Sequence, residues 1–238
     1  MVYIGFLGYY LCGGLVLISV LIALVAQVRV HGAFNKYSKE YSPLDMTGAE
    51  LARKMADENG LSVSISRTSG ALSDHFDPTT NSVNLSSEVY DSKSVAAHAI
   101  VAHEMGHAMQ HNENYIPYKI RQTTVKISNV VSRLLVPMII IGLLVEFFLF
   151  AGLGNIILYV FVGIYAVSFA VSLVTLPVEY NASKRAKVYL ASVGVEGEDA
   201  YGVSDVLNAA ALTYVAAALV NLAYLLRILW ILRIFSRD

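Results

Sequence analysis

Long apolar blocks are the feature that most constrains the fold of this chain. Residues 2–28 contain no charged side chain, and about 20 apolar residues are enough to cross roughly 30 Å of hydrocarbon. Three further apolar blocks cover residues 134–153, 156–178 and 206–226. Hydrophobic residues make up 56% of the sequence and are gathered in these blocks rather than spread evenly, which is unlike an ordinary soluble domain. The blocks predict a multi-pass helical membrane protein.

The order of apolar and polar segments suggests a domain organisation. The mixed segment over residues 31–133 is the only one long enough to build a water-exposed domain. We therefore expect an α+β protein, mainly helical and integral to the membrane, in which a small polar domain carries the chemistry. The other expected parts are a transmembrane anchor (1–30), a transmembrane helical hairpin (134–178), a helix and loop (179–205), and a transmembrane or interfacial helix with a basic tail (206–238).

The charges give an orientation and exclude some functions. Lysines and arginines follow the first block, precede the second and follow the third, whereas none lies at the hairpin tip. The positive-inside rule then places the polar domain in the cytoplasm. A fourth crossing would carry the basic tail outside, so either residues 206–226 do not span fully or the rule fails there. The net charge of −1 gives no reason to expect nucleic acid as a partner, and the single cysteine, Cys12, excludes a cysteine-based zinc site.

Within the polar domain, local patterns predict two helices and two strands. Thr47 and Glu50 stand at capping-box spacing before an amphipathic helix that stops at Gly60. Residues 61–67 and 81–87 alternate apolar and polar side chains, as half-buried strands do. The intervening "SDHFDPTTN" reads as a loop or turn. A further helix is expected to contain "VAAHAIVAHEMGHAMQH" and to stop before Pro117.

This last helix carries the strongest functional motif, "HEMGH". His103 and His107 stand four residues apart and so project from one helix face, where two imidazoles can share a zinc ion. Glu104 can take a proton from a water molecule that the metal activates. Gly106 leaves the helix surface bare, so that another ligand-bearing helix can come close.

Two histidines leave a catalytic zinc site one protein ligand short. Glu179 follows the third apolar block directly, where the hairpin returns the chain to the face that it left, and Pro177 suits the first turn of a new helix there. A solvated glutamate at a helix N-terminus explains Glu179 equally well. The other candidate ligands are Glu113, His75 and Asp77.

The motifs "DHFDP", "NSVNLSSEVY", "AAHAIVAHEMGHAMQH", "LPVEYNASKRA" and "AALTYVAAAL" resemble, in this order and over nearly the whole chain, the YugP-like bacterial membrane zinc metallopeptidases. That resemblance implies a zincin-like domain, a Zn²⁺ cofactor and a glutamate ligand from a second helix, as in the HtpX-like and CAAX-prenyl peptidases. Related peptidases carry this glutamate in E-x-x-A-D, which selects Glu179. Ser183 stands where an aspartate is more usual, so its hydrogen bond to a ligand histidine is left open.

The resemblance also implies that the strand before the metal helix pairs with an extended substrate, a role that falls to Asn81, Ser82, Val83 and Asn84. An exposed edge strand without this role remains the alternative. Arg185 is expected beside the site, and the candidates for stabilising an oxyanion are Arg185, Tyr180 and His111.

The expected function is that of a zinc-dependent endopeptidase acting on membrane or membrane-proximal proteins. Its expected partners are the lipid bilayer and a protein or peptide substrate; the sequence specifies neither a regulatory membrane partner nor a homo-oligomer. One alternative is a non-proteolytic membrane scaffold with a structural or vestigial zinc site, which would not need Glu104. Another is a transporter or channel that uses Glu146 inside the second apolar block, although the favoured position of this carboxylate is at the interface near the hairpin's far end.

Overall fold

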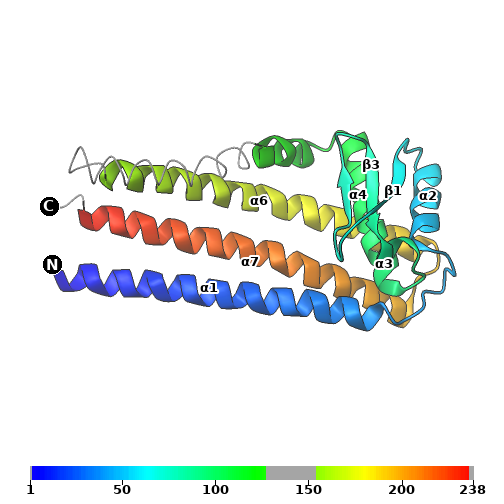
Figure 1. The fold of residues 1–238 in the computed structure, drawn as a ribbon, viewed down its shortest axis with the longest axis horizontal. Helices are drawn as coiled ribbons and strands as arrows, with labels where there is room; N and C mark the ends of the chain where they lie inside the picture. Colours follow the sequence, from blue (N-terminus) through cyan, green and yellow to red (C-terminus); the bar gives the residue numbers. More distant parts are fainter. Residues whose placement is uncertain (1, 127–153, 236–238) are drawn as a thin grey trace. The chain divides into compact units, whose positions relative to one another are not determined.

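The structure is a computed structural model that describes residues 2–126 and 154–235 (Figure 1). The described part is mostly helical with one small sheet, in agreement with the α+β class expected from the sequence. A helical segment without a label covers residues 116–126. The labelled elements are α1 (Val2–Tyr37), α2 (Gly48–Glu58), β1 (Ser64–Thr68), β2 (His75–Asp77), β3 (Ser82–Ser86), α3 (Ser87–Tyr90), α4 (Val95–Asn112), α6 (Gly154–Ser192) and α7 (Gly197–Phe235).

The chain divides into two compact units. The first is formed by residues up to 25, 120–175 and from 214 onward, and the second by residues 26–119 and 176–213. The second unit therefore combines most of the predicted polar domain with segments of α1, α6 and α7. The long helices α1, α6 and α7 contribute residues to both units.

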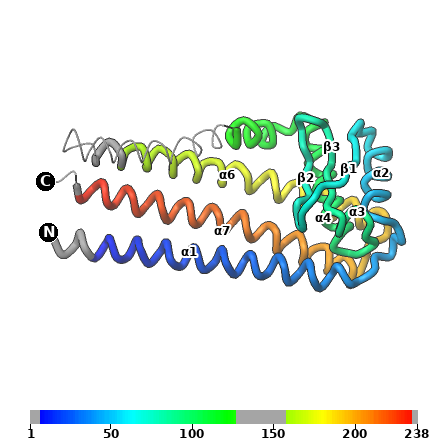
Figure 2. The backbone as a smooth tube through the Cα atoms, viewed as in Figure 1, coloured from blue at the N-terminus to red at the C-terminus, as the bar shows by residue number. Residues whose placement is uncertain are grey.

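Helix α4 forms the centre of the second unit. The side chain of Ser94 caps its N-terminus by accepting a hydrogen bond from the Ala97 N–H at 3.1 Å. Thirteen of its 18 residues are buried, as expected for a helix that is covered on all sides. Helices α2 and α3 and strands β2 and β3 pack against it (Figure 2). The buried polar side chains of α4 are thus enclosed by several elements.

Helix α2 forms as the sequence predicts. The side chain of Thr47 accepts from the Glu50 N–H, and the Glu50 carboxylate accepts from the Thr47 N–H at 2.7 Å, which completes the capping box. Leu51 and Met55, one turn apart, are buried in the core of the second unit. The expected amphipathic helix is confirmed.

The sheet has the strand order β1-β3-β2. Strand β3 pairs in parallel with β1, Val83 opposite Ile65, and antiparallel with β2, Val83 opposite Phe76. The prediction of two strands was incomplete, because His75–Asp77, which was expected to be loop, forms β2. Three residues are too short to show an alternating pattern, so only the pairing with β3 reveals this strand.

Three described helices are long and apolar enough to cross a membrane, over Leu7–Tyr37, Leu158–Ser192 and Gly197–Ile234. These helices agree with the first, third and fourth apolar blocks. The second block and Glu146 lie outside the described residues. The prediction that a new helix begins at Pro177 was wrong, because α6 runs through Pro177 without a break.

Polar and aromatic side chains join α6 and α7 within the first unit. Asn221 donates from Nδ2 to Ser172 Oγ at 2.8 Å, and the rings of Tyr165 and Tyr224 stack with centroids 5.1 Å apart. An apolar helix pair gains little from the hydrophobic effect in lipid, so such contacts are the kind that specify packing there.

Candidate metal centre

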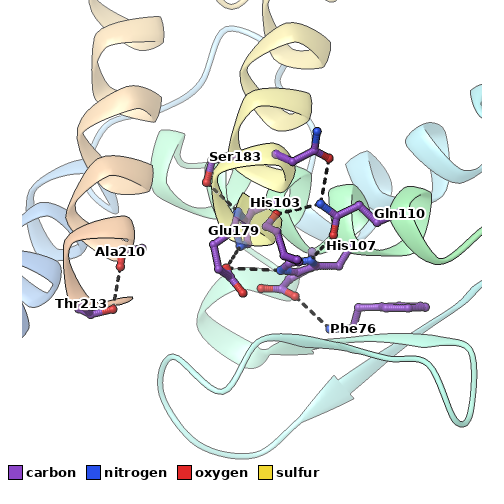
Figure 3. A network of polar contacts seen from close by, with 11 residues as sticks. Phe76, His103, His107, Gln110, Glu179, Ser183, Ala210 and Thr213 are labelled. Carbon is purple, nitrogen blue, oxygen red and sulfur yellow. Dashed lines mark hydrogen bonds and ion pairs between the residues drawn. The ribbon is translucent and has the colours of Figure 1, made fainter. Parts of the chain in front are cut away.

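Three side chains from two helices converge in the second unit. His103 and His107 project from one face of α4, and Glu179 projects from α6 towards them (Figure 3). Glu179 Oε2 lies 3.1 Å from His103 Nε2 and 3.6 Å from His107 Nε2. One donor atom from each of the three residues lies within 4.8 Å of the others. Two imidazole nitrogens and a carboxylate oxygen are thus gathered at one point.

The histidines are held by their other ring nitrogens. His103 Nδ1 lies 3.1 Å from Ser183 Oγ, and His107 Nδ1 lies 3.0 Å from Gln110 Oε1. Both contacts leave the Nε2 atoms directed at Glu179. The sequence left open whether Ser183 can form a hydrogen bond to a ligand histidine. In the structure its hydroxyl lies within hydrogen-bonding distance of His103 Nδ1.

Gly106 allows α4 and α6 to approach closely, as the sequence predicts. A Cβ atom placed on Gly106 would lie 2.9 Å from the Ala182 carbonyl oxygen and 3.1 Å from the Ala182 Cα. Both are backbone atoms, so no side chain can move aside to make room. The absent side chain at residue 106 therefore sets the distance between the helix that carries the histidines and the helix that carries Glu179.

Glu104 lies beside the two histidines. Its Oε2 accepts a hydrogen bond from the backbone N–H of Phe76 in β2 at 3.0 Å. Burial raises the pKa of its carboxyl group to about 7, with His103 opposing the rise and the nearby Glu179 adding to it. A carboxyl group in this range can exchange protons near neutral pH.

The donor set fits zinc. Imidazole and carboxylate are the common ligands of Zn²⁺, and three protein ligands are the number that leaves a position for water in a catalytic site. Because each histidine makes its remaining contact through Nδ1, both Nε2 atoms can donate a lone pair. His103, His107 and Glu179 are therefore the residues that could hold a metal ion.

The other candidate ligands are engaged elsewhere. Glu113 forms an ion pair with Arg185, Asp77 caps the turn at Thr79 and Thr80, and the His75 ring nitrogens lie near Ser73 and Asn84. Among the residues that the structure describes, no second group of three or more histidine or acidic side chains is arranged to hold a metal ion.

The prediction that Asn81, Ser82, Val83 and Asn84 lie on an edge strand was wrong. Residues 82–84 belong to β3, the central strand, whose two sides are already paired with β1 and β2, and Asn81 immediately precedes it. A strand whose two sides are both hydrogen-bonded to other strands has no free side with which to pair an extended substrate. The edge that lies at Glu104 is β2.

The remaining residues predicted from the sequence to lie near the site are Arg185, His111 and Tyr180. Arg185 contacts Asn181 and Glu113, and no direct contact with a proposed ligand is found for it in the described part of the chain. The His111 ring packs 5.6 Å from the Phe76 ring, and Tyr180 is 52% exposed. Sequence reasoning missed Gln110, although its position three residues after His107 on a helix is a signal that could have revealed it.

The fold and the donor set define a class: a chain with helices long and apolar enough to cross a membrane, in which two histidines of one helix meet a glutamate of another. Residues 13–233 match the family described as "Putative neutral zinc metallopeptidase", and the chain belongs to this family. Its cofactor is Zn²⁺, in agreement with the expectation from the sequence.

A relative supports the same assignment. The chain is 41% identical over 208 residues to the "Putative membrane protease YugP" of Bacillus subtilis (strain 168), which covers 87% of this chain and 89% of the relative. No solved structure matches the chain significantly.

Proposed function

We propose that the protein is a membrane-bound zinc endopeptidase that hydrolyses peptide bonds of membrane or membrane-proximal proteins. The observation that carries this proposal is the convergence of His103, His107 and Glu179 with Glu104 beside them. His103, His107 and Glu179 hold the metal ion, and Glu104 is the general base. A structural zinc site would not need Glu104, and this argues against the scaffold alternative.

Bound zinc supplies Lewis acidity, which acidifies a water molecule and polarises the scissile carbonyl group. The residues of the chain do the rest. The Phe76 N–H holds Glu104 Oε2, and this leaves Oε1 to take the proton of the attacking water. Glu104 then passes the proton to the nitrogen of the departing amine. Ser183 and Gln110 keep the two imidazole rings oriented.

The substrate backbone lies along β2 in this proposal. Phe76 uses its N–H for Glu104 rather than for β3, so the outer side of β2 faces the proposed general base. An extended peptide that lies along this edge, with the Phe76 N–H still donated to Glu104, brings its carbonyl groups near Glu104. The candidate membrane spans favour substrates that are themselves at the bilayer, and the positive charges that flank the apolar blocks favour a cytoplasmic active site.

The substitution Glu104→Gln tests the proposal in two ways. The full chain in detergent should retain zinc, because all three ligands remain, while peptide hydrolysis should fall by about 10²- to 10⁴-fold. Glu88→Gln, at an exposed position of α3, is the matched control and should hydrolyse peptides at the native rate. Turnover within twofold of native in Glu104→Gln would refute the mechanism.

The substrates can be sought in the same experiment. Membranes from cells that carry the native chain or Glu104→Gln are compared for new protein N-termini. We expect N-termini that appear only with the native chain and that map to membrane proteins close to the bilayer. An identical set of N-termini in both membranes would contradict the endopeptidase assignment and favour the scaffold.

A further inference from the structure

A chain of polar side chains runs from the end of α4 to one of the proposed metal ligands. Arg185 on α6 donates to both carboxylate oxygens of Glu113, at 2.6 and 2.7 Å, and from Nε to Asn181 Oδ1 at 2.8 Å. Gln110 on α4 donates from Nε2 to Asn181 Oδ1 at 2.9 Å, and its Oε1 meets His107 Nδ1 at 3.0 Å. We refer to these five residues as the Glu113–His107 chain.

Every hydrogen bond in this chain has only one direction that chemistry allows. The Arg185 guanidinium can only donate, so the Asn181 atom that it meets must be the acceptor oxygen. That oxygen then requires a donor from Gln110, which is its Nε2 group. The backbone carbonyl of Val178 accepts from the same Nε2 at 2.8 Å and fixes the amide independently. Gln110 Oε1 is therefore an acceptor, and His107 Nδ1 must carry the proton.

We propose that Gln110 is a positioning residue that holds His107 as its Nδ1–H tautomer, and that Asn181, Arg185 and Glu113 fix the direction of the Gln110 amide. The Nε2 lone pair of His107 is thereby directed at the metal before the metal arrives. This inference rests on the proposed function to the extent that His107 is a zinc ligand.

Burial makes a reversed arrangement unfavourable. Gln110 is completely buried. A flipped amide would place its oxygen against the Val178 and Asn181 oxygens. Two contacts between acceptor atoms at a buried amide are strongly disfavoured. The neighbouring ligand differs, because the Ser183 hydroxyl can either donate to or accept from His103 Nδ1.

The test measures the dissociation constant of Zn²⁺ for the full chain in detergent, by competition with a chelator. Gln110→Leu removes the acceptor of the His107 Nδ1–H and should weaken zinc binding about 10- to 100-fold. The matched pair is at Asn181. Asn181→Asp still accepts from Gln110 and Arg185 and should bind zinc with nearly native affinity, whereas Asn181→Leu should bind it more weakly.

A spectroscopic measurement separates positioning from packing. The protein has six histidines, so the ring signals of the ¹⁵N-histidine-labelled, zinc-loaded chain can be assigned by substitution. The His107 Nδ1–H proton should be protected from exchange in the native chain and in Asn181→Asp. It should lose this protection in Gln110→Leu. Packing alone would leave the signal unchanged in all three proteins.

Two results would overturn the inference: native zinc affinity in Gln110→Leu, or equal losses in Asn181→Asp and Asn181→Leu. If Gln110→Leu does not fold, the Asn181 pair still decides. The substitution Glu179→Ala separates this inference from the proposed function. Native zinc affinity in Glu179→Ala would place the metal elsewhere and refute the site itself, whereas zinc loss there with unchanged Gln110→Leu would refute only the role of Gln110.

Discussion

A single methyl group on Gly106 should weaken zinc binding, because it forces the two ligand-bearing helices apart. In Gly106→Ala the new Cβ lies 2.9 Å from the Ala182 carbonyl oxygen, whereas ordinary contact begins at 3.4 Å, so α4 and α6 must separate by about 0.5 Å. The distance between a metal ion and its ligand atom can deviate by only about 0.2 Å from its ideal value. Glu179 lies one turn before Ala182 on α6 and therefore moves with that helix. Its carboxylate is then further from His103 and His107 on α4.

Two effects of this substitution oppose each other in the stability of the metal-free protein. Alanine is favoured over glycine in a helix interior by about 1 kcal/mol, whereas overpacking a tight contact costs about 1 to 3 kcal/mol. The net change in the free energy of unfolding is therefore between about zero and 2 kcal/mol of destabilisation. Zinc binding gives the clearer result, because helix propensity is the same with and without the metal.

The metal can bind only when the helices return to their native separation, so zinc binding must overcome the part of the overpacking cost that the metal-free protein relieves by letting the helices separate. Complete relief of about 1 to 3 kcal/mol is the upper limit and, at about 1.36 kcal/mol per factor of ten, corresponds to a dissociation constant about 5- to 150-fold higher. The assay is competition with a chelator. The control is Gly32→Ala in α1, where a Cβ would meet nothing within 4 Å, and zinc affinity should be native. Native affinity in Gly106→Ala would refute the reasoning.

Three further outcomes are expected. Ser183→Asp should bind zinc more tightly than the native chain and Ser183→Ala more weakly, because a carboxylate is a stronger acceptor for the His103 Nδ1–H than the hydroxyl at 3.1 Å. Competition with a chelator measures both affinities, and the reverse order would contradict the contact between Ser183 and His103. Thr47→Ala should lower the free energy of unfolding by about 1 kcal/mol through loss of the capping box; an unchanged melting temperature would count against it. A cysteine at the exposed Asn59, in a chain with Cys12→Ser, should resist impermeant thiol reagents in intact cells, and ready labelling would overturn the cytoplasmic orientation.

The sequence alone determined the features that depend on neighbours along the chain. The capping box of Thr47 and Glu50 needs residues three apart, and the shared face of His103 and His107 needs residues four apart; helical geometry fixes both without help from the rest of the protein. The apolar blocks likewise predicted long helices, since hydropathy and length are properties of a segment.

Contacts between distant segments were decided only by the tertiary structure. From the residues themselves, Glu179 could be a ligand or a solvated carboxylate; its position beside His103, 76 residues away in sequence, comes from the packing of α6 against α4. The resemblance to known peptidases favoured the ligand, but the orientation of the His107 ring by Gln110 depends on Asn181, 71 residues further along. No local pattern encodes such a pair.

Strand order and helix continuity were decided in the same way. Alternation marked residues 81–87 as a strand but could not show which strands flank it, and β2 made it the central strand. Pro177 predicted a helix start from its fixed φ and missing N–H, yet α6 continues through it. The preference of proline for the first turn of a helix amounts to a few kcal/mol. It can be overcome where the surrounding helix is stabilised by many packed side chains. Val178, Ala182 and Ala186 are all completely buried, and this tertiary burial outweighs the signal of one proline.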